Sequence, residues 1–318
     1  MKTNDLHELP KFKDSWSYLY VEHCHIEQED CAITIHDKKG RIPVPCANLS
    51  VLMLGPGICI THAAISMLAD SGCLVIWCGE EGIRLYSVGM GETRNSSNFL
   101  FQVETWANKE KRMKVIKHLY QMRFEEELDF KLSLEQIRGM EGMRVRKIYA
   151  NASETSGVAW TGRKYQHGNW KAADPINRAL SAANSCLYGI CHAAIVSAGF
   201  SSAIGFIHTG KMLSFVYDIA DLYKTELTIP LAFQIVSESQ QDVSRRARLG
   251  CRDIFKSSRI LARIIPDIKK VLGLSSDKDD LSGKYDQDPA QPGALWDPDN
   301  KVIEGGKMHP IIETKEKE

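Results

Sequence analysis

Residues 89–98 read GMGETRNSSN, and the apolar periodicity of the sequence changes across this polar, glycine-containing stretch. Such a composition is typical of a linker between folded units. Before it, short apolar segments alternate with turn residues, which indicates strands; after it, apolar residues recur at helical spacing. We therefore expect an α+β multidomain protein, with a small N-terminal β-rich domain over residues 1–90, a linker over 91–98 and a larger all-α domain over 99–273.

The N-terminal part is rich in Val, Ile, Tyr and Trp, residue types that favour strands. Its apolar segments lie at residues 16–21, 32–36, 42–46, 51–54, 74–78 and 83–87. One stretch, residues 61–70 (THAAISMLAD), has helical character instead, with Thr61 placed to cap its start and Gly72 just beyond its end. These features predict a β-rich domain that is interrupted by one helix.

The part after the linker contains long helical patterns, at residues 99–128, 134–152, 177–198, 213–224 and 242–272. Beyond them, residues 274–318 form a tail with 11 Asp and Glu against 6 Lys and Arg, a net charge of −5. Because the whole chain has 40 of each kind, residues 1–273 carry a net charge of +5. The tail has too little apolar surface to offset its ordering entropy, so we expect it to be disordered until a partner binds.

The composition is that of a globular protein, with 43% hydrophobic and 25% charged residues. No apolar run approaches the roughly 18–20 residues of a membrane span, and the first residues, MKTNDLHELP, lack the apolar core of a secretory signal. We therefore expect a cytoplasmic protein without a membrane partner. The nine cysteines include no CxxC pair, which argues against a disulfide framework and a structural zinc site.

Three short motifs carry residues that suit metal-ion chemistry. Glu141 has glycines close on either side in RGMEGMRVR, His208 follows an apolar run, and Asp218 and Asp221 share one flank of a predicted helix. Each glycine costs about 1 kcal/mol in a helix relative to alanine, so we expect another backbone or a phosphate chain to approach there. Three carboxylates with one imidazole are donors that suit Mg²⁺ or Mn²⁺.

Each of these residues also has an ordinary explanation. Glu141 can be an exposed acid on a basic helix, and His208 a hydrogen-bonded core residue. The two aspartates can form a solvated helix face with Lys224 as their partner. The motifs together favour the metal site, because the same part of the chain supplies basic side chains that can hold phosphate: Arg138, Arg146, Lys211, Arg245 and Arg248. Carboxylates, a divalent metal and basic side chains are the usual parts of phosphodiester chemistry.

Four segments resemble a known family: RGMEGMRVR, INRALSAANSCLYG, GFIHTGKMLSFVYDIADLYK and RLGCRDIFKSS, which begin at residues 138, 176, 205 and 248. Together they are similar to the CRISPR-associated integrase, the endonuclease subunit of spacer acquisition, and most like its type I-E branch. The resemblance covers roughly residues 10–270. It implies an N-terminal β domain through which two chains dimerise, followed by a helical catalytic domain.

The resemblance also implies roles for individual residues. It places metal ligands for Mg²⁺ or Mn²⁺ at Glu141, His208 and Asp221. It places Asp218 beside them, and it places a wedge against the end of the DNA duplex at His23. The implied DNA contacts are six basic side chains: Arg84, Arg138, Arg146, Lys211, Arg245 and Arg248.

The reaction that the resemblance implies is insertion of captured foreign DNA fragments (protospacers) into a CRISPR array. The 3′-OH of a double-stranded fragment with 3′ overhangs attacks a phosphodiester of the CRISPR repeat DNA. The implied assembly is a homodimer that joins a small second CRISPR adaptation subunit in a larger hetero-oligomer. The tail docks on that subunit, through a stretch around residues 287–294.

The residues themselves leave rival functions open. One is a stand-alone metal-dependent nuclease on branched DNA, and another is a non-catalytic DNA-binding scaffold that uses the same basic helices. A third is a tyrosine recombinase, because His208 and Lys211 stand in an HTGK element. The third is disfavoured, since Tyr217 follows that element too closely and the paired acids would have no purpose.

Overall fold

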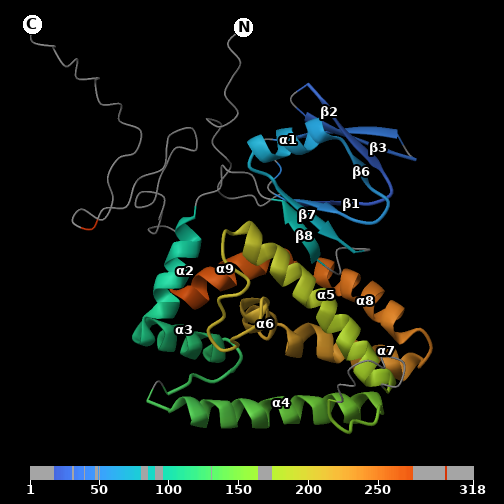
Figure 1. Cartoon of the computed structure of the whole chain (residues 1–318). Helices are drawn as coiled ribbons and strands as arrows, with labels where there is room; N and C mark the ends of the chain where they lie inside the picture. The colour runs from blue at the N-terminus through green and yellow to red at the C-terminus, as the bar shows by residue number, and fades with distance from the viewer. Residues whose placement is uncertain are drawn as a thin grey trace, which may run out of the picture.

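Strands occupy the first part of the chain and helices nearly all of the rest, so the predicted α+β order is confirmed (Figure 1). The computed structural model describes residues 18–30, 32–38, 40–46, 49, 51–79, 85–89, 96–129, 131–163, 174–274 and 298. In Figure 1 the strands lie at one end of the molecule, and helix α4 (Leu134–Ser156) lies along the opposite end. The other helices that follow the strands in the chain lie between them.

Within the described residues, the strands form two four-stranded sheets. The first has the order β1 (Tyr18–Val21), β5 (Val51–Leu54), β7 (Leu74–Cys78) and β8 (Leu85–Gly89). Its first three strands are parallel, and β8 is antiparallel to β7. The second has the order β4 (Gly40–Pro45), β3 (Ala32–Asp37), β2 (His25–Glu29) and β6 (Cys59–Ile60). Antiparallel pairs join β2 to β3 and β3 to β4, whereas β6 is parallel to β2.

Helix α1 (His62–Asp70) is the one helix that interrupts these strands within the described residues, as the sequence predicted. The Thr61 hydroxyl accepts a hydrogen bond from the Ala64 N–H at 3.3 Å and so caps its start. Gly72 has a positive φ of 62° just beyond its end, a conformation that glycine adopts without strain. Leu68 of α1 is fully buried in a core that it shares with both sheets.

The helical part contains eight further α-helices in the described residues. They are α2 (Ser97–Ala107), α3 (Lys109–Gln121), α4, α5 (Pro175–Ser197), α6 (Ser214–Ala220), α7 (Ile229–Glu238), α8 (Val243–Ser257) and α9 (Ile260–Leu272). A π-helical turn, Lys224–Thr228, leads directly into α7. The sequence analysis did not predict α7. Its Pro230 lies in the first turn, where a helix tolerates the missing N–H.

Two of the predicted helices are each divided in the structure. The prediction of one helix over residues 99–128 is wrong, because Asn108 is extended and ends α2 there. Its side chain then accepts hydrogen bonds from the N–H groups of Glu110 and Lys111, both at 3.0 Å, and starts α3. Likewise residues 242–272 form α8 and α9, separated at Arg259, whose φ is 50°.

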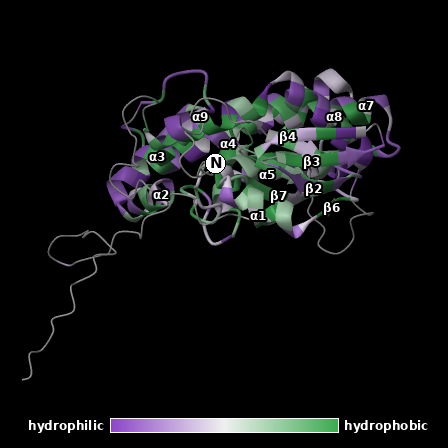
Figure 2. Ribbon diagram, turned by 90° about the horizontal axis from the view of Figure 1, so that it is seen from above, coloured by the Kyte–Doolittle hydropathy of each residue, from purple (hydrophilic) through white to green (hydrophobic). Residues whose placement is uncertain are grey.

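Helix α5 is the central helix of the structure. It packs against α6, α7, α8 and α9, and its Ala193 is buried together with Leu74 and Ile76 of β7. Figure 2 shows hydrophobic colour at α5 and β7 and hydrophilic stretches on α2 and α3. By length and composition α5 is apolar enough to cross a membrane, which corrects the expectation that no stretch approaches this length. Of its most apolar stretch of 18 residues, 67% is buried inside the protein, so α5 is a core helix here.

Candidate active site

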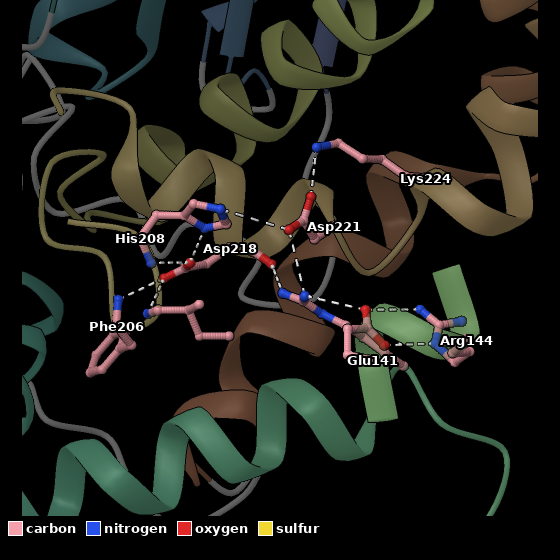
Figure 3. Close-up of polar contacts among 9 residues, drawn as sticks. Glu141, Arg144, Phe206, His208, Asp218, Asp221 and Lys224 are labelled. Carbon is pink, nitrogen blue, oxygen red and sulfur yellow. Dashed lines mark hydrogen bonds and ion pairs between the residues drawn. The ribbon is translucent and has the colours of Figure 1, made fainter. Parts of the chain in front are cut away.

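The loop between α5 and α6 folds around one carboxylate. Asp218 is fully buried and accepts hydrogen bonds from the N–H groups of Phe206 at 2.6 Å, Ile207 at 3.1 Å and His208 at 2.9 Å (Figure 3). Gly205 permits this tight path, since a Cβ there would lie 2.4 Å from the carbonyl oxygen of His208. The aspartate that the sequence placed beside the metal ligands is therefore a buried acceptor that shapes the loop.

The same carboxylate orients the imidazole of His208. The Nδ1 atom of His208 lies 2.7 Å from Oδ1 of Asp218, and its Nε2 atom lies 4.0 Å from Oδ2 of Asp221. A neutral imidazole that donates its Nδ1–H to a carboxylate presents the Nε2 lone pair to a ligand, as is usual for metal-binding histidines. The side chain is 41% exposed, so the alternative of a core histidine does not describe it.

Asp221 follows the last turn of α6 and is surrounded by cations. Its Oδ1 lies 2.6 Å from Nζ of Lys224, and its Oδ2 lies 3.5 Å from a terminal nitrogen of Arg123. Burial alone would raise the pKa of Asp221, but Lys224, Arg123 and His208 together hold this pKa below its ordinary value. Burial alone would lower the pKa of Lys224, and the Asp221 carboxylate outweighs it and raises that pKa. The pair is therefore ionised at neutral pH.

Glu141 lies on α4 and faces the same Arg123 from the other side. Its carboxylate accepts two hydrogen bonds from Arg144, at 2.7 and 3.1 Å, and its Oε1 lies 3.7 Å from Arg123 (Figure 3). A Cβ at Gly139 would meet nothing within 4 Å, and at Gly142 only the end of the Arg146 side chain at 3.9 Å. The expected close approach of another backbone is thus absent at these glycines, and the surface there is open.

The three predicted metal ligands lie near one another, but they do not form a complete coordination shell. Within the described part of the chain, no three His, Cys, Asp or Glu side chains are close enough to hold a metal ion. Arg123 stands between Glu141 and Asp221, and it is a site residue that the sequence analysis missed. Two carboxylates and an imidazole whose Nδ1 is fixed by a third carboxylate nevertheless form a donor set that fits Mg²⁺ or Mn²⁺.

Five of the six predicted DNA-binding side chains lie in the described residues. Arg138 and Arg146 are exposed on α4, the helix of Glu141, and Lys211 is exposed in the loop that carries His208. Arg245 is exposed and Arg248 is half-buried on α8, whose opposite face is buried. Arg84 lies outside the described residues. The structure thus brings Arg138, Arg146 and Lys211 onto the elements that carry the site.

His23, the predicted wedge, is an exposed residue at the turn between β1 and β2. Its φ of 51° is unusual for a residue with a side chain, and its N–H donates to the carbonyl oxygen of Pro56 at 2.9 Å. A Cβ at Gly57 would lie 2.4 Å from Nδ1 of His23, so the imidazole needs a glycine beside it. The backbone at His23 is therefore held in a tight turn, and the role of His23 as a wedge stays a prediction.

Comparison with known proteins decides the family. A family model described as "CRISPR associated protein Cas1" matches residues 17–130 and 121–248. The chain belongs to the Cas1 family. Cas1 endonucleases of CRISPR adaptation are the family that the four motifs predicted, so the prediction is confirmed at this level. The type I-E branch is not singled out by these matches.

Individual Cas1 proteins match over most of the chain. "CRISPR-associated endonuclease Cas1 2" of Thermus thermophilus is 51% identical over 305 residues, which is 95% of this chain and 92% of that protein. "CRISPR-associated endonuclease Cas1" of Escherichia coli is 42% identical and covers 82% of this chain and 86% of that protein. A crystal structure of a TtCas1–DNA complex superposes with a TM-score of 0.78 at 52% identity, over 83% of this chain and 99% of that one.

Proposed function

We propose that this Cas1 protein is a metal-dependent DNA integrase and endonuclease that inserts captured foreign DNA into a CRISPR array. The observation that carries the proposal is the convergence of Glu141, His208 and Asp221 from three separate segments around one place. Exposed basic side chains lie on two of the elements that carry these residues, namely α4 and the loop of His208. The crystal structure of TtCas1 with DNA supports DNA as the ligand of these basic side chains.

The proposed reaction exchanges one phosphodiester for another. The 3′-OH oxygen of the captured fragment forms a bond to a phosphorus atom of the repeat DNA, and the bond from that phosphorus to the flanking strand breaks. The flanking strand leaves with a new 3′-OH, so the number of phosphodiesters is unchanged. With water as the attacking group, the same site would hydrolyse branched DNA.

The chain's own residues have distinct tasks in this reaction. Glu141, His208 and Asp221 would hold Mg²⁺ or Mn²⁺, which lowers the pKa of the attacking hydroxyl and screens the phosphate charge. Asp218 fixes the ring of His208, and its own carboxylate is occupied by backbone N–H groups. Arg138, Arg146 and Lys211 bind phosphates of the DNA, which makes binding dependent on salt.

We expect joining to require a divalent cation. A fragment with 3′ overhangs, a supercoiled plasmid that carries a CRISPR repeat, and the small second adaptation subunit are incubated with this protein. Joined product is expected with Mn²⁺ at least as much as with Mg²⁺, and excess EDTA is expected to abolish it. Joining that persists in EDTA would contradict the metal assignment. Cut strands without joined product would favour a stand-alone nuclease.

The assembly is also part of the proposal. Two chains dimerise through the β-rich part over residues 1–90, and the dimer binds the small second adaptation subunit through residues 274–318. This tail lies outside the described residues, apart from Leu274 and Pro298. The four motifs most resemble those of the type I-E branch, and we assign the chain to that branch on this likeness.

The dimer contact can be tested on exposed apolar side chains. Ile42 on β4 is 50% exposed and Tyr86 on β8 is 65% exposed. The double variant Ile42→Asp/Tyr86→Asp is expected to shift the protein from dimer to monomer in light scattering, because charges are costly in an apolar interface. Leu100→Asp on α2, where the side chain is 37% exposed, is the matched control and is expected to stay dimeric. A double variant that remains a full dimer would contradict this placement.

A further inference from the structure

Arg123 is the cation at the centre of the site. It follows the end of α3, and its side chain is only 5% exposed. One terminal nitrogen lies 3.7 Å from Glu141 and 3.5 Å from Asp221, and the other donates to the carbonyl oxygen of Asp218 at 3.4 Å. The guanidinium lies 5.3 Å from the ring centre of Tyr120. One side chain that follows α3 thus connects α4 with α6.

Arg123 is held mainly by opposite charges, and its hydrogen bonding is incomplete. Its Nε atom is buried and has no hydrogen-bond partner among the described residues. Its two carboxylate neighbours lie at ion-pair distances, beyond good hydrogen-bond distance. A buried guanidinium is costly unless opposite charges face it, and Glu141 and Asp221 would repel each other without a cation between them. Arg123 therefore depends on the two carboxylates, and its charge reduces the repulsion between them.

Counting charges shows why this matters for a metal ion. Two carboxylates, those of Glu141 and Asp221, pair with three cations, the side chains of Arg123, Arg144 and Lys224. The negative charge of these two carboxylates is thus fully compensated without a divalent cation. A cation that approaches the two facing carboxylates meets the positive charge of Arg123 at short range, where charges interact strongly in a protein.

We infer that Arg123 is a built-in counter-cation, which holds Glu141 and Asp221 together in the metal-free protein and weakens their affinity for a divalent cation. This inference rests on the proposed function, because it takes those carboxylates as metal ligands. Arg123 is thus a positioning residue, and its charge influences the concentration of divalent cation at which the site is occupied. DNA phosphates bring further negative charge, so metal and DNA each strengthen the binding of the other.

The test measures Mn²⁺ binding by the full-length protein without DNA, from the electron paramagnetic resonance signal of free Mn²⁺. Arg123→Met and Arg123→Gln remove the charge, and each is expected to bind Mn²⁺ about tenfold more tightly or better. Both are expected to melt at a lower temperature than the wild type without metal, and to gain more from added Mn²⁺. Arg123→Lys keeps the charge and is expected to bind Mn²⁺ as weakly as the wild type.

Arg112, on the helix α3 that precedes Arg123, provides a matched control. Its side chain donates to the carbonyl oxygen of Phe206 at 3.1 Å and lies over the ring of Trp106, and neither of these two contacts is to a carboxylate of the site. Arg112→Met is expected to lower the melting temperature and to leave Mn²⁺ affinity unchanged. This separates a loss of structure from a loss of charge.

The outcomes distinguish this inference from the proposed function. If folded Arg123→Met and Arg123→Gln bind Mn²⁺ no more tightly than the wild type, or if Arg123→Lys binds as tightly as they do, the inference is overturned. Should the methionine variant not fold, the glutamine variant decides, because its amide can still bond both carboxylates. If Asp221→Asn leaves Mn²⁺ binding unchanged, the proposed metal site itself is wrong.

Discussion

Asp221→Asn is expected to lower strand joining by about 10²–10³-fold and to leave DNA affinity within about twofold. The substitution removes the charge of a carboxylate that lies within 4.0 Å of His208 and 3.5 Å of Arg123. The asparagine carbonyl can still accept a hydrogen bond from Lys224, which lies 2.6 Å from Oδ1 in the native protein. The local structure is therefore retained while the charge that would bind the metal is lost.

DNA affinity should survive because it comes from other side chains. In the proposed function the phosphates are held by exposed basic side chains such as those of Arg138 and Lys211, and binding of this kind follows the number of phosphate contacts. Joining is followed with a labelled fragment and a repeat-containing plasmid, and affinity with the same fragment by fluorescence anisotropy. A variant that joins at the wild-type rate would exclude Asp221 from the reaction.

Glu226→Gln is the matched control for Asp221→Asn. Glu226 lies in the π-helical turn that follows Asp221. It accepts two hydrogen bonds from Arg263, at 2.8 and 2.7 Å, and not from the cations that contact Asp221. Its pKa is lowered chiefly by the bond from Arg263. The variant is expected to join DNA at the wild-type rate. If Glu226→Gln also lost joining, the loss in Asp221→Asn would reflect this segment as a whole.

The order of strands and helices could be predicted because it depends on local periodicity. Alternation with a period of two and recurrence with a period of 3.6 are visible within a few residues. The breaks were harder to predict, since Asn108 occurs in a run whose apolar spacing continues through it. Its capping hydrogen bonds outweigh that continuity, and a capped start stabilises α3 by about 1 kcal/mol.

The candidate site could be predicted only in part. Spacing placed Asp218 and Asp221 on one flank of a helix, which suggested similar tasks for both. The structure gives them different ones, because the loop before α6 folds back and brings three N–H groups to Asp218. Arg123 could not be predicted at all, since its contact with Glu141 and Asp221 arises from the packing of α3 against distant segments.

Asp218→Asn is expected to lower the free energy of unfolding by about 3–5 kcal/mol. The Asp218 carboxylate has no solvent exposure, and it accepts hydrogen bonds from three backbone N–H groups and from Nδ1 of His208. An asparagine offers one oxygen as an acceptor, and its NH₂ group is a donor. In either orientation of the asparagine amide, its NH₂ group faces buried N–H groups. These N–H groups then have no acceptor.

Asp267→Asn is the matched control for this stability change. The Asp267 carboxylate accepts a hydrogen bond from the Tyr223 hydroxyl at 2.6 Å, and an asparagine oxygen can accept the same bond. The free energy of unfolding should therefore fall by about 1 kcal/mol or less. Urea unfolding followed by circular dichroism measures both variants against the wild type.

Joining by Asp218→Asn should fall further than its stability alone explains. Loss of the carboxylate frees the ring of His208, and the change of a residue that orients a metal-binding histidine typically costs 10–100-fold in activity or metal affinity, so we expect about that loss. The measurement is made at low temperature, where the fraction of unfolded variant is shown to be small. If the folded variant joins DNA at the wild-type rate, Asp218 only shapes the loop, and the orientation of His208 must come from the surrounding backbone.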